Sequence, residues 1–235
     1  MKHVQRNTVY GFLGLLMSSA SLWGADATPS SGVYVGGGAG FAMGSGKHVA
    51  ETKSTSPLGT QHTQSFDKKM GKGALGTLFV GYQGMIAETD LFWAAELYGM
   101  FAPISGKATY SENNTEVSSE AKKSFAGGLA LRGGHKFDEW YPYIKLALDM
   151  NRIAYNYKDV DNNARTTYTK KQSGWLPMAS VGVGTEWDVG VVRLRAEYAY
   201  AMAVGKASKK IGDNVTLSMK SYKEHRLVAG VAYAF

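Results

Sequence analysis

The sequence contains no cysteine and only five prolines among its 235 residues. Without cysteine, the chain cannot form a disulfide, bind a metal through thiolates or use a thiol nucleophile. Long apolar runs are also missing. A membrane helix needs roughly 20 apolar residues, and neither residues 9–17 nor any other segment reaches that length. These absences exclude a disulfide-stabilised secreted domain and a helical membrane protein.

The N-terminal residues have the pattern of a secretory signal peptide. Lys2, His3 and Arg6 form a basic start, residues 9–17 form a short apolar core, and small residues follow up to Ala27. This order of regions is typical of a cleaved export signal. We predict a signal peptide over residues 1–27 and a single mature domain over residues 28–235.

The last ten residues, RLVAGVAYAF, alternate in polarity and end on an aromatic ring. Side chains at every second position of a strand share a face, so one face carries only apolar residues, namely Leu227, Ala229, Val231, Tyr233 and Phe235. This alternation predicts a strand with one apolar face that ends the chain.

Eight segments in all have this alternation, each with one uncharged face: residues 33–43, 74–82, 91–101, 124–136, 143–151, 176–187, 191–203 and 226–235. A soluble β-sandwich with its apolar faces turned inward would show the same period. The opposite faces favour a barrel, because they carry mainly glycine and alanine with a few isolated charges. Such residues suit the narrow interior of a barrel of about eight strands.

The links between these segments alternate in length. Short links cover residues 83–90, 137–140 and 188–190, and long polar links cover residues 44–73, 102–123, 152–174 and 204–225. This layout predicts an all-β fold, an eight-stranded antiparallel transmembrane β-barrel with short periplasmic turns and long extracellular loops. Aromatic residues near the strand ends predict two interfacial girdles, formed by Trp93, Trp140, Tyr141, Trp187 and Phe235 at the short turns and by Phe101, Phe125 and Trp175 at the long loops.

Three motifs resemble a known family. The GVYVGGGAGF opening, the L-x-A-E-Y-x-Y form of residues 194–200 and the VAYAF ending are similar to small outer-membrane barrels of the OmpA/OmpX-like and opacity types. The resemblance covers the whole mature chain. It implies a position in the bacterial outer membrane, contact with outer-membrane lipid and lipopolysaccharide, and insertion by the barrel-assembly machinery. In such proteins the terminal strand is the assembly signal, which here corresponds to Val231, Tyr233 and Phe235.

Charged residues on the small-residue faces are expected to lie in the lumen. They are Glu96, Arg132, Lys145, Asp149, Glu186, Arg193, Arg195, Glu197 and Arg226. Because buried charges require partners, this near-balanced set indicates internal ion pairs, and we expect Glu96 to meet Arg132. Two interpretations follow. The pairs form either a structural plug or the lining of a narrow, porin-like channel for small solutes.

The long links carry the net positive charge. Residues 44–73, 152–174 and 204–225 each hold five basic residues against two acidic ones. The candidate binding residues are Lys68, Lys69, Lys72, Lys206, Lys209 and Lys210. For an exported protein, anionic lipid or polysaccharide is a better counterpart than nucleic acid. The preferred hypothesis is a structural or adhesive surface protein whose basic loops contact lipopolysaccharide, a host glycan or a host protein.

Catalysis is the least favoured hypothesis. Some outer-membrane barrels modify lipid A, and the deacylases among them carry a His-x-Ser pair on one strand. None of the four histidines after the signal peptide is followed by serine at the second position. A calcium-loop start at Asp159 and Asp161 lacks the required glycine and glutamate at Ala164 and Lys170. We predict no enzyme, no cofactor and no metal.

Overall fold

A computed structural model of the chain describes residues 31–52, 62–68, 71–112, 115–161, 166–190, 192–205, 207–211 and 215–235. The described residues form ten strands: β1 (Gly32–Thr52), β2 (His62–Lys68), β3 (Lys72–Met85), β4 (Leu91–Glu112), β5 (Thr115–His135), β6 (Trp140–Asp161), β7 (Thr166–Asp188), β8 (Val192–Ala203), β9 (Ala207–Ile211) and β10 (Val215–Ala234). These residues include no helix of the length and hydropathy that a membrane span requires.

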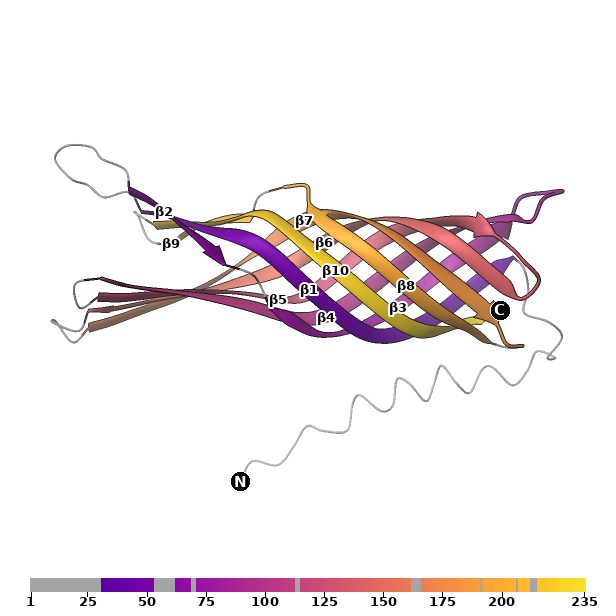
Figure 1. Ribbon diagram of the computed structural model, residues 1–235, viewed down its shortest axis with the longest axis horizontal. Coiled ribbons are helices and arrows are strands. Elements are labelled where there is room, and N and C mark those ends of the chain that lie inside the picture. The colour runs from indigo at the N-terminus through magenta and orange to yellow at the C-terminus, as the bar shows by residue number, and fades with distance from the viewer. Residues whose placement is uncertain are drawn as a thin grey trace, which may run out of the picture.

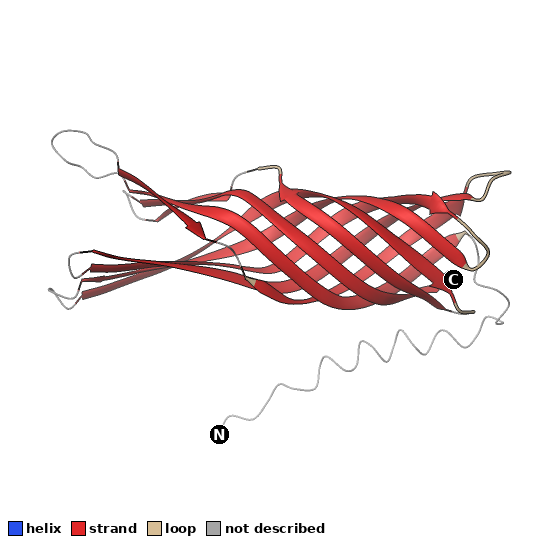
Figure 2. Ribbon diagram, viewed as in Figure 1, coloured by secondary structure: helices blue, strands red, loops and turns tan. Residues whose placement is uncertain are grey.

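The strands form one sheet that closes on itself. Its order is β2-β1-β3-β4-β5-β6-β7-β8-β10-β9, and β1 also pairs with β10, which closes the barrel (Figures 1 and 2). Strands β2 and β9 pair only with the outer parts of β1 and β10. The closed wall therefore has eight strands, all antiparallel to their neighbours. The predicted eight-stranded antiparallel barrel is confirmed.

The outer surface of the barrel is apolar. Leu78 is 71% exposed and Phe41 is 67% exposed, and large apolar side chains cover the outside of all eight strands. In water such a surface would drive aggregation, because burial of apolar area is the main force of folding. A closed barrel pairs its backbone groups internally, which is what a membrane-spanning chain requires. The apolar band therefore faces lipid.

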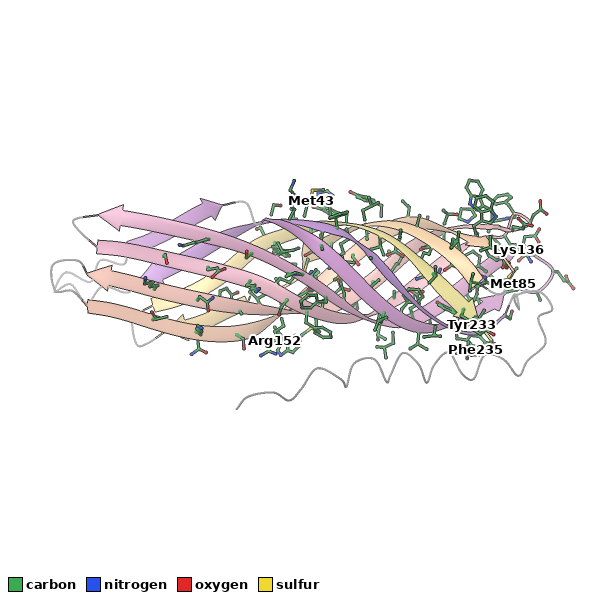
Figure 3. The ribbon with its side chains drawn as sticks, turned by 90° about the horizontal axis from the view of Figure 1, so that it is seen from below. Met43, Met85, Lys136, Arg152, Tyr233 and Phe235 are labelled. Carbon is green, nitrogen blue, oxygen red and sulfur yellow. The ribbon has the colours of Figure 1, made fainter. Side chains whose placement is uncertain are left out.

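The two ends of the barrel differ. Short turns join β3 to β4, β5 to β6 and β7 to β8 at the end where β1 begins and β10 ends. Figure 3 shows Met85, Lys136 and Phe235 at this end, and Met43 and Arg152 at the opposite limit of the apolar band. In outer-membrane barrels the short turns face the periplasm. The end marked by Met43 and Arg152 therefore faces the outside of the cell.

The strands are longer than the sequence predicts. Residues predicted as the long links 102–123 and 152–174 are mostly strand, and they extend β4, β5, β6 and β7 into a four-stranded sheet outside the membrane band. A second outer sheet consists of β2, β1, β10 and β9. Figure 1 shows the two sheets leaving the barrel at its left end.

The reason for this difference is physical. Alternating polarity identifies a strand only where one face meets lipid, and it disappears where both faces meet water. Backbone hydrogen bonds continue the pairing beyond that boundary without requiring a polarity pattern.

The two aromatic girdles are present with one correction. Trp93, Trp140, Trp187 and Phe235 are exposed at the periplasmic end, and the three outer aromatic residues are exposed as well. Tyr141, however, is only 1% exposed and lies inside the barrel. It follows Trp140 directly, and neighbouring side chains on a strand point to opposite faces, so only one of the two can face lipid.

The C-terminal strand completes the closure. The backbone amide of Phe235 donates to the carbonyl oxygen of Val33 at 2.9 Å. Val231 and Phe235 are exposed on the lipid side, and the rings of Tyr233 and Phe235 lie 5.0 Å apart. Their role as an assembly signal stays a prediction, and the predicted signal peptide lies outside the described residues.

We expect the purified chain to form β structure only in detergent or lipid, because its outer surface is apolar. The folded barrel should resist SDS at room temperature and migrate differently before and after boiling. Gel electrophoresis with circular dichroism checks this expectation. A stable, soluble, β-rich monomer in buffer without detergent would contradict the membrane-spanning barrel.

Candidate functional site

The lumen is the most highly organised polar region among the described residues. The structure places all nine predicted lumen charges on the inner face, eight of them buried and Lys145 largely so. Aromatic side chains that sequence reasoning did not place there share this space: Tyr34, Phe79, Phe92, Tyr98, Tyr141 and Tyr143. The lumen is thus filled by charges and rings together, and not mainly by small residues.

The glycines of the inner face make room for these rings. A Cβ atom on Gly184 would overlap the ring of Tyr143 on the neighbouring strand, and one on Gly36 would overlap the ring of Phe79. Each ring therefore covers the glycine opposite it. This arrangement explains why a face rich in glycine still encloses a filled interior.

Two arginines and two glutamates form the centre of the periplasmic half. Arg132 on β5 lies 2.7 Å from Glu186 on β7 and 3.1 Å from Glu96 on β4. Arg195 on β8 donates to the same two carboxylates at 2.8 and 2.7 Å. The expected contact between Glu96 and Arg132 is thus one edge of a four-residue cluster, in which each cation touches both anions.

Neighbouring side chains extend this cluster. The hydroxyl of Tyr34 donates to Glu96 at 2.8 Å and accepts from Arg132 at 2.8 Å. Lys145 and the hydroxyl of Tyr143 bind the two oxygens of Glu197 at 2.8 and 2.9 Å. Lys145 also lies 3.9 Å from Glu96, which links residues of β1, β4, β5, β6 and β8 into one network.

Arg193 lies nearest the periplasmic end. It donates to Gln83 on β3 at 3.0 Å, and its guanidinium lies 4.8 Å from the centre of the Tyr141 ring. A guanidinium over an aromatic face gains a cation–π attraction. Inside the barrel the Tyr141 ring therefore contacts the Arg193 cation, a contact that a ring in the lipid-facing girdle would lack.

A second cluster fills the extracellular half of the lumen. Arg226 on β10 lies 2.6 Å from Asp149 on β6 and 2.7 Å from Glu224. Glu224 also accepts from Lys123 on β5 at 2.6 Å and from the hydroxyl of Tyr222 at 2.7 Å. All five side chains are buried.

Sequence reasoning assigned Lys123 and Glu224 to extracellular loops, and this assignment is wrong. Lys123 is 0% exposed and its ammonium group lies inside the barrel. Glu224 lies two positions from Arg226, so strand alternation carried two residues further would have placed it on the inner face. The predicted strands stopped short of both residues because the apolar outer face ends near Met43.

These contacts cross the lumen. In the closed order β1-β3-β4-β5-β6-β7-β8-β10, strands β5 and β10 face each other, as do β4 and β8. Lys123–Glu224 joins the first pair and Arg195–Glu96 joins the second. Between the two clusters lies a cavity of about 30 Å³ whose lining includes Tyr98 and Ser180. This volume accommodates water and excludes a solute.

The structure describes only some of the predicted basic binding residues. Lys72 is exposed at the start of β3. Lys68 lies in β2, and Lys209 and Lys210 lie in β9, where only the backbone is described. Lys69 and Lys206 lie outside the described residues. Within the part of the chain that the structure describes, no group of three or more His, Asp or Glu residues is arranged to hold a metal ion.

Comparisons with known proteins find only distant structural matches. No family model matches the sequence, and no curated protein matches it significantly. Among solved structures, outer membrane protein OprG from Pseudomonas aeruginosa is 16% identical, with a TM-score of 0.49 over 88% of this chain and 99% of that chain.

Neisserial surface protein A is 20% identical, with a TM-score of 0.47 over 87% of this chain and 98% of that chain. The outer membrane protease OmpT from Escherichia coli is 11% identical, with a TM-score of 0.47 over 89% and 98%. Identities this low assign neither an activity nor a partner to the present chain.

The architecture itself decides the location. A closed antiparallel barrel with an apolar outer band, aromatic residues at both limits, short turns at one end and long extensions at the other has the features of bacterial outer-membrane barrels. The chain is an eight-stranded β-barrel of the bacterial outer membrane. Its lumen is crossed by ion pairs, and its extracellular end continues as two β-sheets.

Replacing Lys123 with methionine should destabilise the barrel. The change leaves Glu224 without its cross-lumen cation, and breaking a buried ion pair costs about 3–5 kcal/mol. The matched control is Lys122→Met, because Lys122 is the next residue on the same strand and is exposed. The control should change the free energy of unfolding by less than about 0.5 kcal/mol.

Urea titration in lipid vesicles, followed by tryptophan fluorescence, measures both effects. The double change Lys123→Met with Glu224→Gln should recover part of the loss, because it removes the unpaired charge. Equal effects at positions 122 and 123 would show that the cross-lumen pair does not form.

Proposed function

We propose that the protein is a non-conducting outer-membrane barrel that presents a basic β-sheet at the cell surface to an acidic partner. The proposal that the barrel does not conduct rests on the ion pairs that join facing walls of the lumen, such as Lys123–Glu224 and Arg195–Glu96. Ions and solutes would have to break these contacts to pass. A function outside the lumen is therefore favoured over a channel.

The two outer sheets differ in charge. The segments that build the sheet of β2, β1, β10 and β9 are residues 44–73, with five lysines against two acidic residues, and residues 204–225, with five lysines against Asp213 and Glu224. Glu224 is neutralised inside the barrel by Lys123 and Arg226. Without it, this sheet and its connections carry a net charge of +7.

The opposite sheet is nearly balanced. Residues 102–123 hold three lysines and three glutamates, and one of the lysines, Lys123, is in the lumen. Residues 152–174 hold five basic residues against two acidic ones. The net charge of this sheet is therefore +2, and the electrostatic field at the cell surface is concentrated over the first sheet.

A positive sheet raised above the membrane suits an extended anionic partner. Sulfated or carboxylated glycans and acidic protein surfaces have the required charge, and sites on rigid scaffolds usually lie on the segments that project from them. The proposal assigns the protein no catalytic step and no cofactor. Its partner is defined by charge, and structural support of the outer membrane is compatible with the same geometry.

Neutralising lysines of the first sheet should weaken binding of heparin, a soluble sulfated polysaccharide. Lys206, Lys209 and Lys210 are changed together to glutamine. At about 1 kcal/mol for each cation near an anionic surface, affinity should fall roughly a hundredfold at low salt. The matched control is Lys158, Lys170 and Lys171 changed to glutamine on the opposite sheet, which should lower affinity far less.

Binding is measured by surface plasmon resonance on protein in detergent, and heat-modified migration on gels shows that each variant is folded. Affinity of the parent should also fall steeply with salt, because the Debye length shrinks from about 10 Å at 0.1 M to about 3 Å at 1 M. Equal losses in the two triple variants would contradict a partner-binding sheet.

Conductance measurements distinguish the proposal from the channel alternative. Because the lumen is filled, the parent protein reconstituted in planar lipid bilayers should show no steady conductance steps, whereas a porin added to the same membrane should. Reproducible steps that persist at low voltage would show that the ion pairs open, and they would favour the small-solute channel.

A further inference from the structure

Three polar side chains and one methionine form a row on the outer, lipid-facing surface of the barrel at the extracellular limit of the apolar band. Lys72 on β3, Met43 on β1, His225 on β10 and Tyr200 on β8 are consecutive in register across four adjacent strands. Residues directly opposite each other in a sheet share a face. Met43 is exposed on the outside, as Figure 3 shows, so the whole row faces outward.

The residues beneath this row indicate where it lies in the membrane. One step towards the membrane centre, the same four strands carry Ala74, Phe41, Leu227 and Tyr198, none of them charged. Phe41 and Leu227 are among the most exposed apolar side chains of the barrel. Acyl chains therefore contact this lower row, and the row of Lys72 and His225 lies two residues, about 7 Å, further along the tilted strands towards the lipid head groups.

A second cation adds to the row. Lys223 lies two residues before His225 on the same face of β10, opposite the polar Ser45 on β1. Lys223 and Lys72 are both exposed. Lys72 and His225 are two strands apart, about 10 Å between backbones. The flexible four-carbon stems of the lysines allow their ammonium groups to converge on one anion beside the imidazole.

The orientation of His225 is fixed by tyrosines. The Tyr198 hydroxyl lies 2.7 Å from Nδ1, and the Tyr200 ring centre lies 5.1 Å from that of the imidazole. When the hydroxyl donates to Nδ1, the ring proton is on Nε2, which is then directed away from the tyrosine as a donor. Two ammonium groups on flexible stems and one oriented N–H group are thus within reach of a single anion on the lipid-facing surface.

We infer that this group, the Lys72–Lys223–His225 site, binds the phosphate of an anionic lipid in the outer leaflet. Charge complementarity and depth carry the assignment. Cations that face lipid at the head-group level meet phosphate, and the apolar row beneath accepts the acyl chains of the same molecule. The inference does not rest on the proposed function, because the site faces the membrane and not the outer sheets.

The opposite side of the barrel provides a matched control. Arg152 on β6 lies at the same limit of the band, between Phe125 and Trp175 in register. Lys122 is exposed on the neighbouring strand. Changing Arg152 and Lys122 to glutamine removes two cations at similar depth, at a place with no histidine held by tyrosines.

The test compares Lys223→Gln with His225→Gln in one variant against the Arg152→Gln and Lys122→Gln control. Each protein is refolded in detergent micelles, and its folding is verified by heat-modified migration. The probes are bisphosphorylated lipid A and the same lipid with its phosphates removed, and binding is measured by native mass spectrometry. The parent should bind the phosphorylated lipid about tenfold or more tightly than the dephosphorylated one.

The Lys223/His225 variant should lose this preference, the control should keep it, and an excess of inorganic phosphate should leave lipid binding unchanged. The inference is overturned if the parent does not distinguish the two lipids, or if the control loses as much as the variant. It is also overturned if inorganic phosphate displaces the lipid, which would reveal a site for a free anion. The heparin test rests on Lys206, Lys209 and Lys210, which stay unchanged in both lipid-binding variants, so the two proposals can fail separately.

Discussion

A charged side chain inside a narrow barrel must find its counter-ion on another part of the wall, because little water is available to solvate it. In this protein that constraint organises the interior. Glu96 contacts two arginines, Glu186 contacts three, and Glu224 contacts Lys123 and Arg226. The rings of Tyr34 and Tyr143 complete the contacts, and glycines on adjacent strands make room for the rings. The filled lumen, and with it the preference for a surface function, follows from this pairing.

The extracellular end is governed by a different constraint. Beyond Met43 and Arg152 the outer face no longer meets lipid, and the pairing of strands continues through backbone hydrogen bonds. The wall then divides into two four-stranded sheets. The two sheets also differ in net charge. The lumen contributes to this difference, because the Lys123–Glu224 pair takes a lysine from the nearly balanced sheet and a glutamate from the basic one into the interior. Interior pairing and surface charge are therefore connected.

Much of this fold was predictable from alternation, since lipid outside and a cramped lumen inside impose opposite demands on successive residues. The same rule predicted the nine inward-facing charged residues, from Glu96 to Arg226. The rule failed where the apolar face ended, because the predicted strands stopped there and left Lys123 and Glu224 in loops. The placement of Tyr141 in the girdle beside Trp140 went against the rule, since alternation puts neighbouring side chains on opposite faces. Which charges contact each other depends on strand order around the closed wall, and a one-dimensional pattern does not contain that information.

The central claim, a lumen filled by side chains that meet across it, is tested most directly by the reactivity of a single cysteine, since the native chain has none. Ser180 on β7 lines the small cavity between the two charge clusters, and Ser173 on the same strand is exposed outside the membrane band. In vesicles, Ser173→Cys should react rapidly with a charged, water-soluble thiol reagent. Ser180→Cys should remain unmodified until the barrel is unfolded. Equally rapid modification at both positions would contradict the filled lumen.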